Sequence, residues 1–175
     1  MANRILALGG KPATGKTTLL RDVINTYKPF VKFNFGLVKG MYFSKHSLYI
    51  IGIYDKSVFS GTDKLSMAVQ PDFIRFCKKI ENGKILFEGD RLFNQSLFDK
   101  VNCDIMVIEV NEKIEKQRHE KRNDSQSAKF IKSKQTKIEN ITKITLSIIS
   151  IFGIIWGGTF TYLNYKKDIK VEIFN

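Results

Sequence analysis

The sequence has few cysteines, and its first residues do not predict a secretory leader. Its two cysteines, Cys77 and Cys103, lie in apolar surroundings without the spacing of metal ligands, so we expect core thiols in a reducing compartment. The first apolar run, residues 4–8, is too short for the hydrophobic region of a signal peptide. These absences exclude a cysteine-based metal site and favour a cytoplasmic location.

Acidic residues are also scarce, with 17 Asp and Glu against 29 Lys and Arg, which gives a formal net charge of +12. A positive field of this size concentrates nucleic acid or anionic nucleotides near the surface. The abundance of Lys, Ile, Asn and Phe, typical of AT-rich coding DNA, explains the same charge by composition alone. The 175 residues, 43% apolar and with 14 Phe, suit one folded α/β domain.

One stretch organises the chain. Residues 10–17 match the pattern G-x-x-x-x-G-K-[ST] at every position, between an apolar run at 5–8 and a helical pattern at 17–24. In this order of strand, glycine loop and helix, backbone N–H groups surround nucleotide phosphates, Lys16 reaches the β and γ oxygens, and the Thr17 hydroxyl takes a Mg²⁺ position. The predicted nucleotide-binding residues are Gly10, Lys11, Pro12, Ala13, Thr14, Gly15, Lys16, Thr17 and Thr18.

The next segment changes to a strand pattern. The first helix should end before Lys28-Pro29 because a residue that precedes proline avoids the α region. Residues 31–54 predict a β-hairpin whose tip carries His46 as a solvated turn residue. A helix follows within 65–81, with Pro71 near its start.

A second informative place is the run at 84–91, an apolar strand that ends in Glu88, Asp90 and Arg91. Beside a phosphate loop, one carboxylate can hold Mg²⁺ through water and the other can orient or deprotonate a nucleophile, while Arg91 faces the phosphates or the substrate. A charged turn that faces solvent is the alternative. A short helix near 95–101 and another apolar run at 103–110 then predict a parallel sheet covered on both faces by helices.

The polar region that follows has two interpretations. Residues 112–124 are nearly all charged, which suits a solvated helix or a basic lid, over about 112–127, that closes on the triphosphate with Arg118 and Arg122. The predicted helix at 125–141 carries a basic stripe. It suits either a solvated face or phosphate contacts to nucleic acid through Lys132, Lys134 and Lys137.

Four blocks, residues 10–18, 61–71, 86–92 and 134–141, together resemble phage-type P-loop kinases related to thymidylate kinase. That group includes enzymes that phosphorylate the 5-hydroxymethyl group of modified uracil in phage DNA. The resemblance covers residues 1–143 and implies the P-loop NTPase fold of the nucleotide-kinase type, a parallel sheet flanked by helices with a β-hairpin insertion and a basic lid.

The resemblance also implies the reaction, which is transfer of the γ-phosphoryl group of ATP to a hydroxyl, with Mg²⁺ held by Thr17 and Asp90, in a bacterial or phage-infected cell. Asp63 would lie on the acceptor side, with Tyr54, Asp55 and Phe59 as candidates for lining the acceptor pocket. Modified DNA is the favoured acceptor. A free nucleoside or nucleoside monophosphate is the alternative within the class, and a membrane-associated P-loop NTPase is the alternative outside it.

The chain departs from that pattern at its end. Residues 144–163 carry no charge and suit either a transmembrane helix or a last core strand, over 143–150, that leads into an apolar turn. Residues 164–175 are expected to form an irregular basic tail. The sequence leaves the oligomeric state open.

Overall fold

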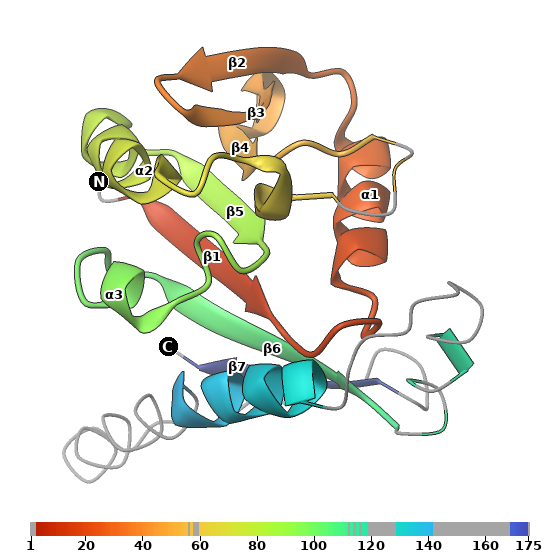
Figure 1. Ribbon diagram of the computed structural model, residues 1–175. Helices are drawn as coiled ribbons and strands as arrows, with labels where there is room; N and C mark the ends of the chain where they lie inside the picture. Colours follow the sequence, from red (N-terminus) through yellow and green to blue (C-terminus); the bar gives the residue numbers. More distant parts are fainter. Residues whose placement is uncertain are drawn as a thin grey trace, which may run out of the picture. The chain divides into compact units, whose positions relative to one another are not determined.

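The computed structural model describes residues 3–55, 57, 60–111, 113, 115, 117–118, 129–141 and 169–174, the last range by its backbone alone. The chain has a mixed α/β fold with a sheet flanked by helices (Figure 1). It divides into two compact units, Met1–Leu8 with Thr17–Asp104, and Gly9–Lys16 with Ile105–Asn175. Each unit is described separately below.

The first unit contains strands in the order β2-β3-β4-β5-β1. Its parallel part joins β4 (Leu48–Ile51), β5 (Lys84–Glu88) and β1 (Arg4–Gly9), with Leu86 opposite both Ile50 and Leu6. Ile50, Ile85 and Phe87 are buried, as expected for strands covered on both faces. The predicted strand that ends in Glu88 is therefore confirmed.

The predicted hairpin is confirmed in part and corrected in its place in the sheet. β2 (Val31–Phe35), β3 (Val38–Phe43) and β4 pair antiparallel, and the turn η1 (Ser44–His46) joins β3 to β4 with His46 exposed at the tip. Because β4 also pairs with β5, these strands extend the sheet and are not an insertion, and the sheet is mixed and not purely parallel. A three-residue turn permits only antiparallel neighbours, whereas the long connection from β4 to β5 permits a parallel pair.

The helices of this unit agree with the predicted ones. α1 (Lys16–Tyr27) ends before Lys28 and buries Leu20 and Ile24. α2 (Val69–Lys79) has Pro71 in its first turn and packs Phe73 edge-on against Phe87, with ring centroids 5.2 Å apart. The short helix α3 (Gln95–Phe98) is capped by the Asn94 side chain, which accepts a hydrogen bond from the Leu97 N–H.

The second unit contains the loop Gly9–Lys16, β6 (Asp104–Val110), a helix at 129–141 and β7 (Ile169–Phe174). β7 pairs antiparallel with β6, from Ile105 opposite Phe174 to Val110 opposite Ile169. The irregular tail expected for 164–175 is therefore wrong over 169–174. Apolar and charged residues alternate from 169 to 173, which is a strand pattern that the basic composition of the tail obscured.

The uncharged stretch 144–163 lies outside the described residues, so both of its interpretations stay predictions. Among the helices that the structure does describe, none has the length and apolar character of a membrane span.

Candidate phosphate-binding loop and acidic cluster

The loop Gly9–Lys16 has an unusual backbone. Gly10, Ala13 and Gly15 all have positive φ, at 140°, 63° and 102°. A side chain at Gly10 would place its Cβ 2.5 Å from the Ile108 carbonyl oxygen, so this position admits only glycine. Ala13 is buried, and its backbone has the left-handed conformation, which non-glycine residues seldom adopt. Backbone of this kind turns N–H groups toward a common concave side that suits an anion.

Lys16 lies across its own loop. Its Nζ donates hydrogen bonds to the carbonyl oxygens of Gly10, at 2.6 Å, and of Lys11, at 2.7 Å. The Thr14 hydroxyl donates to the same Lys11 carbonyl at 2.9 Å. The cation expected to contact phosphate oxygens is therefore held at the loop itself.

Two residues of the segment that follows β6, Glu115 and Arg118, also contact the loop. Arg118 donates from Nη1 to the carbonyl oxygens of Ala13, at 3.1 Å, and Thr14, at 3.0 Å. Glu115, which is buried, lies 3.6 Å from the Lys11 Nζ through its Oε2. The two residues are three apart in a helical segment and so share one side of it. Arg118 was predicted to contact the transferring phosphoryl group, but its guanidinium contacts the loop backbone. Arg122 and most of the predicted lid lie outside the described residues.

This contact predicts a binding defect for Arg118→Ala. Hydrogen bonds to a charged donor contribute about 1.5–3 kcal/mol, so removing this guanidinium should weaken nucleotide affinity by about tenfold. Titration with a fluorescent ATP analogue measures it, and Arg75→Ala on α2, which removes an exposed arginine, is the control. Unchanged affinity together with slower turnover would instead assign Arg118 to the transition state.

The acids at the end of β5 belong to a tight cluster in the first unit. The Thr62 hydroxyl donates to the Glu88 carbonyl oxygen at 2.7 Å, and the Asp90 N–H donates to the Asp63 Oδ1 at 2.7 Å. Gly89, with φ 105°, lets these segments meet, because a Cβ there would lie 2.7 Å from the Thr62 hydroxyl. Three predicted site residues, Asp63, Glu88 and Asp90, are thus brought together.

Two members of the cluster, Asp63 and Tyr54, have raised pKa values. Burial of the carboxylate and the charge of Asp90 raise the pKa of Asp63, against an opposing effect of the Asp90 and Arg91 N–H groups and the Arg91 charge. Burial, followed by the charges of Glu88 and Asp63, raises the pKa of Tyr54 well above its usual value. The Tyr54 hydroxyl is buried, with no hydrogen-bond partner among the described residues, so it remains a neutral phenol beside the acids.

The raised pKa of Asp63 predicts that Asp63→Asn gains thermal stability at neutral pH. Because the carboxyl binds its proton more tightly in the folded chain, the protein loses stability as the pH rises from the ordinary pKa of 3.8 through the raised pKa. Asparagine keeps an acceptor oxygen for the Asp90 N–H and does not ionise. The variant should therefore melt at a higher temperature than the parent at pH 7 and at the same temperature below about pH 3.8.

Thermal unfolding at both pH values measures this effect, with Asp22→Asn on the exposed side of α1 as the control. A parent chain that is more stable than Asp63→Asn at pH 7 would show that the hydrogen bonds outweigh the repulsion.

Asp55 has a different surrounding from the other predicted acceptor residues. Its exposed carboxylate binds the Lys64 amine and the Ser57 hydroxyl, which together lower its pKa. Arg21, on α1, donates to the Asp55 carbonyl oxygen at 2.6 Å and to the Ser60 hydroxyl at 2.9 Å.

The sequence did not indicate a role for Arg21 or Thr62, because neither residue belongs to a local pattern that points to its distant partners. Phe59 lies outside the described residues.

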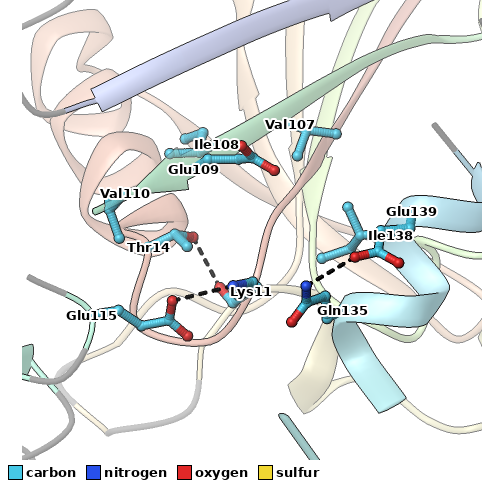
Figure 2. A pocket seen from close by; sticks show the side chains of 10 residues that line it. All are labelled: Lys11, Thr14, Val107, Ile108, Glu109, Val110, Glu115, Gln135, Ile138 and Glu139. Carbon is cyan, nitrogen blue, oxygen red and sulfur yellow. Dashed lines mark hydrogen bonds and ion pairs between the residues drawn. The ribbon is translucent and has the colours of Figure 1, made fainter. Parts of the chain in front are cut away.

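A pocket of about 230 Å³ opens beside the loop within the second unit. Figure 2 shows Lys11, Thr14 and Glu115 on one side of it and the helical residues Gln135, Ile138 and Glu139 on the other. Residues of β6 complete its lining, namely Val107, Ile108, Glu109 and Val110. The loop therefore forms one wall of a hollow large enough for part of a small ligand.

Comparison of the chain with protein-family models, curated proteins and solved structures gives no match. The site is accordingly interpreted from its own geometry and chemistry.

Thr17 and Asp90 are the residues predicted to bind Mg²⁺. Thr17 is in the first turn of α1 and Asp90 follows β5, and their joint role as Mg²⁺ ligands stays a prediction. In the described part of the chain, no group of three or more His, Cys, Asp or Glu could hold a metal ion. A Mg²⁺ ion bound through nucleotide oxygens and water would not need such a group.

The predicted nucleic-acid residues share the helix at 129–141. Lys132 is exposed, whereas the Lys134 Nζ lies over the Phe130 ring, 4.8 Å from its centroid. This places an amine above a half-exposed aromatic ring, an arrangement that a solvated helix also accommodates. Nucleic-acid binding by Lys132, Lys134 and Lys137 stays a prediction.

Proposed function

We propose that the chain is a phosphotransferase with the P-loop NTPase fold of the nucleotide-kinase type, moving the γ-phosphoryl group of ATP to a hydroxyl of a nucleotide. The observation that carries the proposal is the loop backbone, with positive φ at Gly10, Ala13 and Gly15 and the Lys16 amine held across it. Loops of this sequence and backbone surround phosphates with N–H groups.

The proposed roles follow the chemistry of each group. Lys16 would contact the β and γ oxygens and stabilise the charge that shifts during transfer. Thr17 and Asp90 would hold Mg²⁺, which would supply positive charge against the phosphate oxygens. Glu88 would orient the acceptor hydroxyl. The Asp63 carboxylate, which accepts a hydrogen bond from the Asp90 N–H, would hold the backbone at Asp90 in place beside Glu88.

We propose 5-hydroxymethyluracil in DNA as the acceptor. The net charge of +12 and the lysines on the helix at 129–141 support a polymeric substrate, because a free monophosphate needs only one or two arginines. A free nucleoside or nucleoside monophosphate would not use those lysines.

The test is transfer of ³²P from γ-labelled ATP, with Mg²⁺, to two acceptors in parallel. One is DNA that contains 5-hydroxymethyluracil, with the same DNA carrying thymine as its control, and the other is a pool of free nucleosides and nucleoside monophosphates. Label in the modified DNA alone supports the proposal. Label only in the small molecules makes the chain a nucleotide kinase, and released phosphate without label in either acceptor makes it an NTPase.

A further inference from the structure

The pocket beside the loop has the chemistry of a base-binding site, and this inference rests on the proposed nucleotide site. We propose that the pocket holds the purine base of the donor nucleotide, and that the Glu139 carboxylate accepts a hydrogen bond from an exocyclic amino group of that base. The shared chemistry is an amino-bearing purine, which adenine supplies through N6 and guanine through N2.

The position of the pocket links it to the phosphates. Lys11 and Thr14 line the pocket and also belong to the loop that would surround the phosphates. A nucleotide whose phosphates lie in the loop therefore has the pocket within reach of its base. At about 230 Å³, the pocket lies below the usual range of roughly 300–1,000 Å³ for drug-sized ligands, which suits a single base.

The walls of the pocket suit the faces of a base. Ile108 and Val107 are buried in β6, each about 4% exposed, and Ile138 contributes from the helix at 129–141. Flat aromatic ligands gain free energy by covering apolar surface of this kind.

The polar lining suits a ligand that donates hydrogen bonds. Three carboxylates line the pocket, those of Glu109, Glu115 and Glu139, against a single cation, Lys11, which is paired with Glu115. Glu115 lies on the loop side with Lys11, whereas Glu139 lies on the opposite side, on the helix (Figure 2), so a nucleotide with its phosphates at the loop can direct its amino group toward Glu139. A phosphate group beside Glu139 would be repelled.

Gln135 positions the carboxylate that we assign to the base. Its Nε2 donates to the Glu139 Oε1 at 2.9 Å, between residues four apart on one side of the helix (Figure 2). An ionised carboxylate has about four lone-pair sites, and this bond uses one. Gln135 therefore acts as a positioning residue, and Glu139 as the residue that determines specificity.

The experiment measures binding of four triphosphates by titration calorimetry with Mg²⁺. ATP is paired with purine riboside triphosphate and GTP with ITP, because each pair differs chiefly by one exocyclic amino group. We expect the amino-bearing member of one pair to bind about tenfold more tightly, and that pair identifies the base. In Glu139→Ala the difference should vanish, and in Glu139→Gln, which keeps an acceptor oxygen, it should partly return. Glu81→Ala, an exposed glutamate before β5, is the matched control.

The outcomes separate this inference from the proposed function. If none of the four nucleotides binds, the triphosphate site itself is wrong. Equal binding of all four leaves the triphosphate site in place and overturns base recognition by Glu139, as does an amino-group preference that persists in Glu139→Ala.

Discussion

Lys16→Ala should lower phosphoryl transfer at least about a hundredfold, because removing one group that stabilises transition-state charge typically costs 10²–10³ in turnover. The Lys16 amine is the cation that the loop backbone itself holds, through the Gly10 and Lys11 carbonyl oxygens. The initial rate of transfer from γ-labelled ATP measures the effect. Lys45→Ala, at the exposed tip between β3 and β4, removes a lysine elsewhere and should transfer at the parental rate.

Lys16→Arg extends this test, because it keeps the positive charge. A guanidinium is planar and larger than an ammonium, and the two loop carbonyl oxygens lie only 2.6 and 2.7 Å from the lysine Nζ. We expect arginine to restore little of the lost rate. Parental turnover in Lys16→Ala would overturn the assignment of the loop as the triphosphate site.

Gly10→Ala should abolish nucleotide binding and lower the melting temperature by several degrees. At φ 140° a residue with a Cβ is strained, at a cost of about 1–3 kcal/mol, and here the Cβ would also lie 2.5 Å from the Ile108 carbonyl oxygen. Because that oxygen belongs to the backbone of β6, it cannot turn aside as a side chain would. Thermal unfolding and nucleotide titration measure the two effects.

Ala13→Gly is the matched control in the same loop. Its φ of 63° lies in the left-handed region, which glycine enters without strain, so this variant should keep its fold and its nucleotide affinity. Parental binding by Gly10→Ala would show that the loop has a different conformation around its ligand.

The elements of this fold follow from local patterns, whereas the pairing of its strands does not. The apolar run before Glu88 and the helical spacing around Phe73 predict β5 and α2, because a strand covered on both faces has a continuous apolar run and a helix with one buried face has a period of 3.6 residues. No local pattern says that β4 pairs with β5, since that contact joins segments separated by a whole helix. The mixed parallel and antiparallel pairing of the sheet was therefore not predictable from the sequence.

The candidate site divides in the same way. The loop from Gly10 to Thr17 is recognisable from sequence because its phosphate chemistry requires fixed residue types at fixed spacing. The contact of Arg118 with the Ala13 and Thr14 carbonyl oxygens joins residues more than 100 positions apart, and a charged run alone suggests only a lid or a solvated helix. The hydrogen bond between Gln135 and Glu139 differs from the Arg118 contact, because an amide and an acid four residues apart on a predicted helix are a local signal of such a bond.

The second unit is assembled from both ends of the chain, with a consequence for vectorial synthesis on the ribosome. Its loop is synthesised before residues 17–104 of the first unit, whereas β6 and β7, which pair with each other, are synthesised after them. The first unit, complete at Asp104, can fold while translation continues, whereas the loop must wait for its partners from β6 onward. A stalled nascent chain would thus contain the whole phosphate-binding motif before the residues that brace it exist.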